Sequence, residues 1–285
     1  EPYGLAHAAA HSRDGRVVTA GRADGTTTSF DLAIAEYDDA GGLVFSTRFP
    51  VQDSLARATV AVAGVVIDPN GEIVVVGHSS HAIDLGSAGM LEVGGGASDE
   101  EVTDVFVLRL SPAGEVLAVD ATTSSGIDRA STVDLDAASG DVVVGGWFDG
   151  TIRFGSASLS DPLGGAFVLR LARDLGVRYL IQPKTEASTL DLGYGLMVAA
   201  RIRGERVVVS VGNRYVASTG HTELFEIDAL GTTIRTAALP GVSIGDIAVL
   251  SQTDLALAGI LDSSTASPWP VTRGFGRGFV ARQSW

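Results

Sequence analysis

The sequence predicts an all-β fold, a β-propeller of about five four-stranded up-and-down antiparallel blades. Two observations lead to this prediction. Short apolar strands that end in glycine recur five times along the 285 residues, and each is followed by a second apolar strand that carries one charge. No longer segment has a convincing helical period. Repetition of one four-stranded unit is typical of propeller blades, whereas the rungs of a β-solenoid would be shorter.

The second strand of each unit is a short run of β-branched and other apolar residues. The glycines that end these runs are Gly21, Gly77, Gly145, Gly212 and Gly259. The short length and the β-branched residues favour buried strands over helical turns. Turn residues such as Asp14-Gly15 and Asn70-Gly71 precede the runs, and they tolerate the positive φ of a tight hairpin.

The third strand of each unit carries a charge at its fourth position. The charged residues are Glu36, Arg109, Arg170, Glu226 and Arg282. A charge at one fixed place in an otherwise apolar strand indicates a recurrent position that is either exposed or paired. Outer strands such as 43–49 and 116–121 follow and complete the unit.

We predict a single propeller domain over residues 1–285, with approximate units 1–57, 58–130, 131–194, 195–245 and 246–285. The last blade is expected to be one strand short, since the chain ends at Trp285 directly after a third strand. Three alternatives stay open: residues 1–4 complete this blade, the ring closes without a fourth strand, or the chain is a piece of a longer protein.

The long connections of such blades lie on one face, because the short turns of an up-and-down blade all lie on the other. Long loops on a rigid scaffold are where binding sites usually form. Aromatic side chains with polar neighbours on this face could stack on sugars, although each ring could instead fill the joint between two blades. The candidate binding residues are Trp147, Asp149, Tyr194, Arg214, Tyr215 and Trp269.

Two units contain a further motif inside the blade. Residues 83–86 (Ile-Asp-Leu-Gly) parallel residues 152–155 (Ile-Arg-Phe-Gly), and each leads to a Gly-Gly pair. We expect an extra small hairpin with a packing role. The run 146–155 followed by 164–171, and the strand 104–110, resemble the repeat of bacterial SBBP-type β-propellers. The resemblance is clear in units two and three, and it implies a propeller in an exported bacterial protein, without catalytic residues to carry over.

The composition narrows the possible partners. A net charge of −14 and a pI near 4.6 disfavour nucleic acid and anionic membrane surfaces, and no apolar run is long enough to span a membrane. The chain has no cysteine, which excludes disulfides and thiolate chemistry. We expect no metal and no cofactor. Calcium stays an alternative, through the acidic residues Asp99, Glu100, Glu101 and Asp104, which lack the ligand spacing of an EF-hand.

These observations favour a non-catalytic binding or interaction module that is not an enzyme. Its expected partners are another protein, a second copy of itself or a surface glycan, and its expected location is secreted or on the bacterial cell surface, as a mature fragment without its signal peptide. One alternative is a structural subunit of a larger surface assembly. Another is a hydrolase or lyase with its active site over the central channel, which would require converging carboxylates or histidines. A closed ring would favour a self-contained binder, and an unpaired edge would favour assembly.

Overall fold

The computed structural model describes residues 4–24, 30–51, 60–94, 102–124, 126–184, 196–213, 221–240, 242–261 and 278–284. These residues form five antiparallel sheets that follow one another along the chain, and one small hairpin. A single 3-10 turn, η1 (Gly86–Ala88), is the only helical element among them. The predicted all-β propeller is therefore confirmed. In the part of the chain that is described, no helix has the length and apolar character to cross a membrane.

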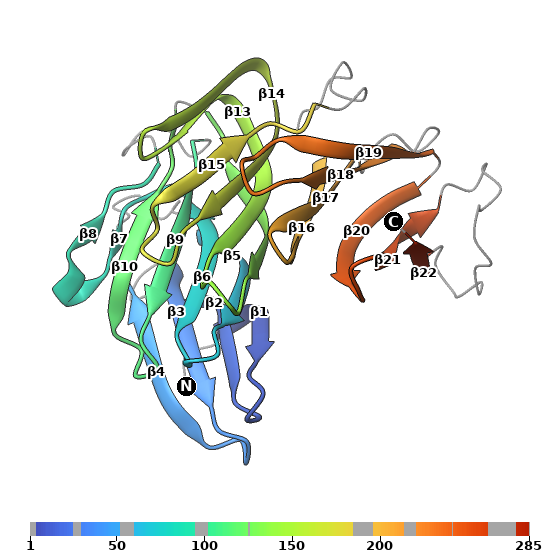
Figure 1. Ribbon diagram of the computed structural model, residues 1–285. Helices are drawn as coiled ribbons and strands as arrows, with labels where there is room; N and C mark the ends of the chain where they lie inside the picture. Colours follow the sequence, from blue (N-terminus) through green and yellow to red (C-terminus); the bar gives the residue numbers. More distant parts are fainter. Residues whose placement is uncertain are drawn as a thin grey trace.

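The first three blades run in chain order from the N-terminus (Figure 1). Blade 1 consists of β1 (Gly4–His11), β2 (Val17–Asp24), β3 (Phe30–Tyr37) and β4 (Leu43–Phe49). Blade 2 consists of β5 (Val60–Ile67), β6 (Ile73–Ser79), β9 (Asp104–Leu110) and β10 (Val116–Ala121), with the small hairpin β7 (Ile83–Asp84) and β8 (Met90–Leu91) inserted. Blade 3 consists of β12 (Arg129–Leu135), β13 (Val142–Phe154), β14 (Ala157–Leu171) and β15 (Val177–Ile181), with β11 (Thr123–Ser124) on β13.

The last two blades differ in strand number. Blade 4 consists of β16 (Leu196–Arg203), β17 (Arg206–Asn213), β18 (His221–Ile227) and β19 (Thr233–Pro240). Blade 5 has three described strands, β20 (Val242–Val249), β21 (Asp254–Leu261) and β22 (Gly278–Ser284). Two of the predicted unit boundaries are wrong, because 130/131 falls inside β12 and 245/246 falls inside β20. The first strand of each blade lies at the centre of the propeller and contains many small residues. Its apolar pattern in the sequence is therefore weak, which is why these boundaries were misplaced.

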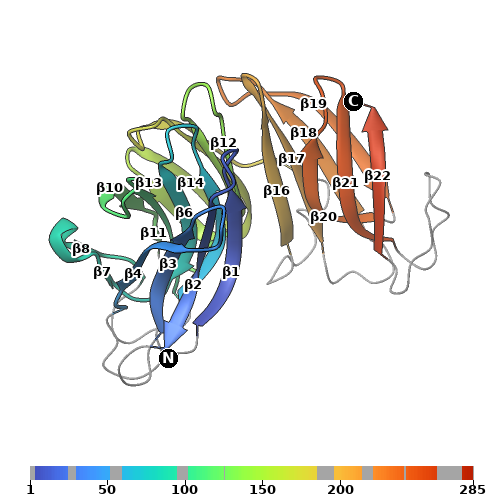
Figure 2. The same cartoon turned by 90° about the horizontal axis from the view of Figure 1, so that it is seen from below.

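The blades are joined by apolar clusters between neighbouring sheets. One cluster combines residues of blades 1 and 2, a second those of blades 2 and 3, a third those of blades 3 and 4, and a fourth those of blades 4 and 5. Each inner blade therefore buries both faces of its sheet, which is why β6 and β9 are buried along almost their whole length. The inner strands β1, β5, β12, β16 and β20 follow one another around the axis (Figure 2).

A glycine in the second strand coincides with a β-bulge in the first strand. Four inner strands contain a bulge, in β1, β5, β12 and β20. A Cβ on the paired glycine would lie only 2.0–2.3 Å from a backbone oxygen of the bulged strand, at Gly21, Gly77, Gly146 and Gly259. Blade 4 has Val211 at this register position, and β16 pairs with β17 without a shift. The equivalent residues are thus Gly146 and Val211 rather than the expected Gly145 and Gly212.

The extra hairpins pack between blades, as the repeated motif predicts. In blade 2 the hairpin β7–β8 places Ile83 and Leu85 in the cluster shared with blade 1, and Asp84 N donates to Pro50 O at 2.8 Å. In blade 3 the hairpin is a continuous extension of β13 and β14, and Ile152 and Phe154 lie in the cluster shared with blade 2. All four apolar side chains are at most 3% exposed. The role of these hairpins is therefore packing.

The ring of described blades is open between blade 5 and blade 1. Neighbouring inner strands are in extended contact from β1 through β5, β12 and β16 to β20, whereas the described parts of β20 and β1 have no such contact. Figure 1 shows blade 5 at one end of the arc and blade 1 at the other. Among the described residues, the outward faces of these two end blades therefore have no neighbouring blade, unlike the faces of the other blades.

Candidate functional site

The inner strands of all five blades line one pocket of about 340 Å³ at the centre of the arc. Its walls are mostly small residues, and three bulge residues, Ala63, Ser131 and Gly245, belong to them. Bulges are common beside binding sites because they redirect the strand locally. The polar side chains of the wall are Ser131, Thr132, Arg201 and Asp246.

Arg201 organises the polar side of this central pocket. Its Nη1 donates to Thr132 Oγ1 at 2.6 Å, and its Nη2 pairs with Asp246 Oδ1 at 2.5 Å. The guanidinium also faces a second carboxylate, Asp134, whose Oδ2 accepts from Ile202 N at 2.7 Å. Burial raises the pKa of Asp134, although this backbone hydrogen bond and Arg201 oppose the shift. The pocket wall thus contains the exposed, ion-paired carboxylate of Asp246, and the half-buried carboxylate of Asp134 interacts with Arg201 from outside the lining residues.

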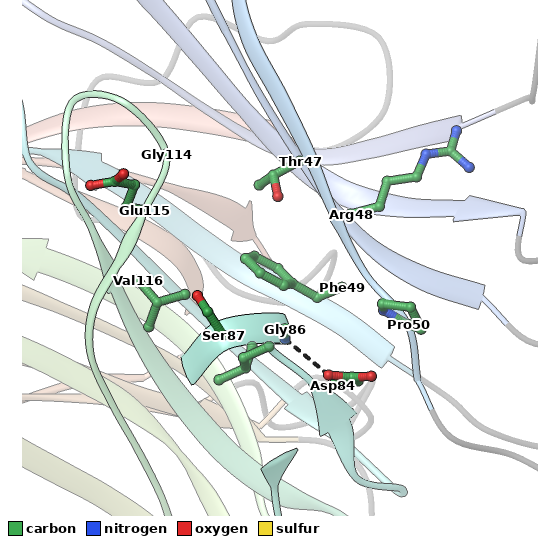
Figure 3. Close-up of a pocket in the computed structure, with 11 residues that line it drawn as sticks. Thr47, Arg48, Phe49, Pro50, Asp84, Gly86, Ser87, Gly114, Glu115 and Val116 are labelled. Carbon is green, nitrogen blue, oxygen red and sulfur yellow. Dashed lines mark hydrogen bonds between the residues drawn. The ribbon is translucent and has the colours of Figure 1, made fainter. Parts of the chain in front are cut away.

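A groove of about 510 Å³ lies on the outer side of the molecule, between β4 and the β7–η1 segment (Figure 3). Its floor is apolar, with Phe49, Leu85 and Val116, and Arg48 and Glu115 stand at its rim. Figure 3 shows Asp84 turned to the backbone, where its carboxylate accepts from Gly86 N at 2.9 Å. No described feature of this groove selects a particular ligand.

The charged position of the third strand is paired in every blade. In the first blade, Arg16 Nη1 lies 2.8 Å from Glu36 Oε1. The signs are reversed in the second, where Arg109 Nη1 lies 2.9 Å from Glu72 Oε2. The remaining pairs are Asp141–Arg170, Arg206–Glu226 and Asp254–Arg282, at 3.1, 3.1 and 2.9 Å. The partner always lies at or beside the start of the second strand. Of the two alternatives that the sequence left open for this position, exposed or paired, the structure shows the paired one.

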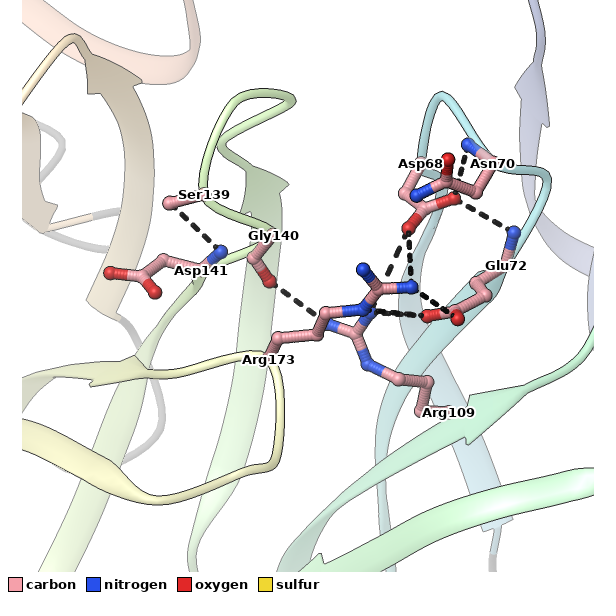
Figure 4. A network of polar contacts seen from close by, with 8 residues as sticks. All are labelled: Asp68, Asn70, Glu72, Arg109, Ser139, Gly140, Asp141 and Arg173. Carbon is pink, nitrogen blue, oxygen red and sulfur yellow. Dashed lines mark hydrogen bonds and ion pairs between the residues drawn. The ribbon is translucent and has the colours of Figure 1, made fainter.

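Two of these arginines also form hydrogen bonds to the next blade. Arg109 Nη2 donates to Gly140 O at 2.9 Å, and Arg170 Nη1 donates to Glu205 O at 2.7 Å. Each acceptor is the last residue of the first hairpin turn in the following blade. In Figure 4, Arg109 reaches from its own Glu72 to this turn, and Arg173 of blade 3 reaches back to Glu72. Hydrogen bonding to Arg173 lowers the pKa of Glu72.

Blade 5 has equivalent residues, but no described blade packs against them. The side chain of Arg282 is 69% exposed, against 3% for Arg109 and 7% for Arg170. Val280 is 74% exposed, whereas Val107 and Val168 at the equivalent position are fully buried. The outward face of blade 5 is therefore built like an internal junction.

Blade 1 presents the matching half of such a junction. In blade 2, the side chains that face the preceding blade are almost completely inaccessible to solvent, as Ile73, Val75 and Leu108 show. Their equivalents in blade 1 are only half-buried and mostly smaller: Val17, Thr19, Ala33, Ala35 and Tyr37. Gly15, the last residue of the first hairpin turn of blade 1, is exposed. We call these two free surfaces the blade 5 face and the blade 1 face.

The structure places only two of the six predicted binding residues. Trp147 is half-buried in β13, and the guanidinium of Arg129 lies over its ring at 5.6 Å, so this aromatic is engaged at a joint within blade 3. Asp149 is exposed at the base of the extended hairpin. The other four, Tyr194, Arg214, Tyr215 and Trp269, lie outside the described residues, so the proposed binding site remains a prediction.

The predicted calcium loop is also largely outside the described residues, which include Asp104 but not Asp99, Glu100 or Glu101. No described group of three or more His, Asp or Glu residues is placed to hold a metal ion. His78 is half-buried in β6, and burial, followed by Arg129 and His7, lowers its pKa to about 4. The imidazole is therefore neutral at physiological pH.

No protein-family model and no curated protein matches the chain. Several solved structures are similar to the chain in the arrangement of the backbone. They include a putative exo-β-1,3-galactanase from Bifidobacterium bifidum, with 12% identity, a TM-score of 0.47 and coverage of 96% of this chain and 85% of that one. An α-L-arabinofuranosidase from Lactobacillus brevis has 10% identity, a TM-score of 0.47 and coverage of 100% and 90%. The GH43_1 enzyme from Xanthomonas citri has 13% identity, a TM-score of 0.38 and coverage of 91% and 82%.

These matches contradict the expectation that the chain is not an enzyme, because enzymes stand among the structures that it is similar to. The sequence contains no repeated set of carboxylates or histidines that would converge on the channel, and this pattern was the ground for that expectation. The physical reason is that a propeller assembles its site from single side chains on separate blades, which leaves no local motif in the sequence. Because the TM-scores are below 0.5, these matches do not assign any activity to this chain.

Proposed function

We propose that this propeller is an interaction module of a larger assembly, in which the blade 5 face docks on the blade 1 face of a second copy. The observation that carries this proposal is the exposure of Val280 and Arg282, whose equivalents are buried in every complete junction. A face with this pattern exposes apolar surface and a charged side chain that the internal junctions bury.

The blade 1 face fits this occupant because the chain repeats one docking chemistry. At the junctions of blade 2 with blade 3 and of blade 3 with blade 4, an arginine of the third strand donates to the carbonyl that ends the next hairpin turn. By the same rule, Arg282 of one copy would donate to Gly15 O of another. Such a head-to-tail contact is heterologous, so it builds closed rings or open filaments rather than a two-fold dimer.

Cross-linking tests this docking directly, since the chain has no cysteine of its own. Val107 and Val144 share a buried cluster at the junction of blades 2 and 3, and their equivalents at the proposed contact are Val280 and Thr19. Mixing a Val280→Cys chain with a Thr19→Cys chain under oxidising conditions should give a disulfide-linked dimer. Leu230→Cys, which is 85% exposed on a remote turn, replaces Val280→Cys as the matched control.

The size of the wild-type protein provides the second readout. Light scattering after gel filtration should show assemblies that grow with concentration, and Val280→Asp should abolish them without lowering Tm, because this side chain is exposed in the single copy. A protein that stays monomeric at every concentration would refute the proposal. So would a Thr19→Cys/Val280→Cys double variant that closes within one chain at high dilution, since blade 5 would then dock on its own blade 1.

A hydrolase acting at the central pocket is the second candidate function. The observation in its favour is that Arg201 interacts with both Asp134 and Asp246: burial raises the pKa of Asp134, as a general acid requires, while Asp246 is exposed and ion-paired. Nitrophenyl glycosides are a suitable substrate panel. Activity that is lost in both Asp134→Asn and Asp246→Asn, but kept in Asp136→Asn, would support this candidate, and no turnover of any substrate would count against it.

A further inference from the structure

Two carboxylates meet at the junction of blades 2 and 3 without a compensating cation. Asp104 is the first residue of β9, and Asp128 directly precedes β12. Their exposed fractions are 3% and 0%. Neither forms an ion pair with any Arg, Lys or His of the described residues. Buried carboxylates are normally paired with a cation or neutralised, because moving an isolated charge out of water is very costly.

The hydrogen bonds around Asp104 hold its carboxylate in place. Oδ2 accepts from Gly94 N at 2.8 Å, and Oδ1 receives a long contact of 3.4 Å from Thr122 Oγ1. Thr122 is itself fixed, because its Oγ1 accepts from Val105 N at 2.8 Å. These contacts hold the carboxylate of Asp104 in one position on blade 2.

The backbone of Asp128 is equally fixed, but its carboxylate is not satisfied. Asp128 N donates to Thr103 O at 2.7 Å, and Asp128 O accepts from Thr103 Oγ1 at 2.9 Å. Within the described residues, both carboxylate oxygens are buried and accept no hydrogen bond of normal geometry. A fully buried group with two unused acceptors is rare in folded proteins and indicates a missing partner.

The electrostatics of the pair agree with a missing positive charge. Burial raises the pKa of both carboxyls, and the neighbouring charge of Asp104 raises that of Asp128 further, to about 8. The side chains of Thr122 and Ser124 lower both pKa values, so they lie close to both carboxyls. Backbone N–H groups of Gly94, Ser124 and Asp149 also face the two carboxyls. The atoms that the four side chains could offer a cation are all oxygen, which is what a hard cation such as Ca²⁺ prefers.

We propose that Asp104 and Asp128 bind a calcium ion, with the hydroxyls of Thr122 and Ser124 beside it, and that this ion ties blade 2 to blade 3. The site differs from the acidic loop singled out in the sequence, since Asp128 comes from the next blade and supplies the unsatisfied oxygens. The inference is independent of the docking between copies, because the junction of blades 2 and 3 is internal to each chain.

Thermal unfolding and calorimetric titration with Ca²⁺, after dialysis against EDTA, test the proposal on the full chain. Ca²⁺ at about one hundred times its Kd should raise Tm by roughly 5 °C, with saturable binding near one ion per chain. Asp128→Asn should lose both effects. It should also unfold in EDTA at a temperature no lower than that of the wild type, because the amide removes a buried charge.

Asp120→Asn, on the outer strand β10 of the same blade, is the matched control and should keep the full response to Ca²⁺. Two results would overturn the proposal. A Ca²⁺ response that survives in Asp128→Asn would place the ion elsewhere. No Ca²⁺ response in the wild type would also refute it, and a Tm that falls between about pH 4 and 8 only while Asp128 is present would then show that the pair holds a proton instead.

Discussion

Replacing Gly77 by alanine should disrupt blade 2 through its backbone. A Cβ at this position would lie 2.3 Å from Ala61 O in β5 and 2.6 Å from Cζ of Phe106 in β9. The ring of Phe106 is fully buried, so neither neighbour can move away freely. Overpacking of a core costs about 1–3 kcal/mol, and a clash with a fixed carbonyl belongs at the upper end of that range.

We therefore expect Gly77→Ala to lower the free energy of unfolding by about 3 kcal/mol and Tm by roughly 6–10 °C. Urea denaturation followed by tryptophan fluorescence, together with calorimetry, measures both. Gly150→Ala is the matched control: a Cβ there would have no neighbour within 4 Å, but φ is +72°. This change should cost only the strain of a left-handed residue, about 1–2 kcal/mol.

Blade 4 indicates how the stability that is lost in Gly77→Ala could be recovered. It has Val211 where blade 2 has Gly77, and its first strand pairs without a bulge. Deleting Ala63, the extra residue of the bulge in β5, should regularise that strand and recover part of the stability that Gly77→Ala loses. If Gly77→Ala costs no more than Gly150→Ala, or if the deletion makes it worse, the coupling between glycine and bulge is wrong.

Two further predictions concern charges. Arg109→Ala should destabilise the protein by about 2–3 kcal/mol, because it leaves Gly140 O without its donor and removes one of the two arginines that pair with half-buried Glu72. Arg282→Ala should leave the stability of the single copy nearly unchanged, because its ion pair is exposed; equal losses in urea denaturation would contradict this. His78 is expected to weaken the fold in acid: its pKa is about 4 when folded against 6.5 when unfolded, so the unfolded chain binds the extra proton and stability falls as the pH drops from 6.5 towards 4. His78→Asn should flatten the decline of Tm over this pH window, and an unchanged slope would show that other groups cause it.

The sequence alone determined the architecture, because local patterns encode it. Val-rich runs that close at glycine and turns of the Asn70-Gly71 kind predicted strands and hairpins that the structure contains. The charge at the fourth position of the third strand was visible in all five units, and its pairing follows from the chemistry of a charge in a buried strand.

The tertiary structure decided what the blades bring together. Asp104 and Asp128 belong to different blades, and Arg201 meets Asp246 only because both inner strands face one channel. Such contacts depend on the relative placement of whole sheets, and no local period of the sequence records that placement. The free faces of blades 1 and 5 are likewise a property of the arc: Val280 has the same sequence context as Val107, and only the presence or absence of a neighbouring blade decides which of them is buried.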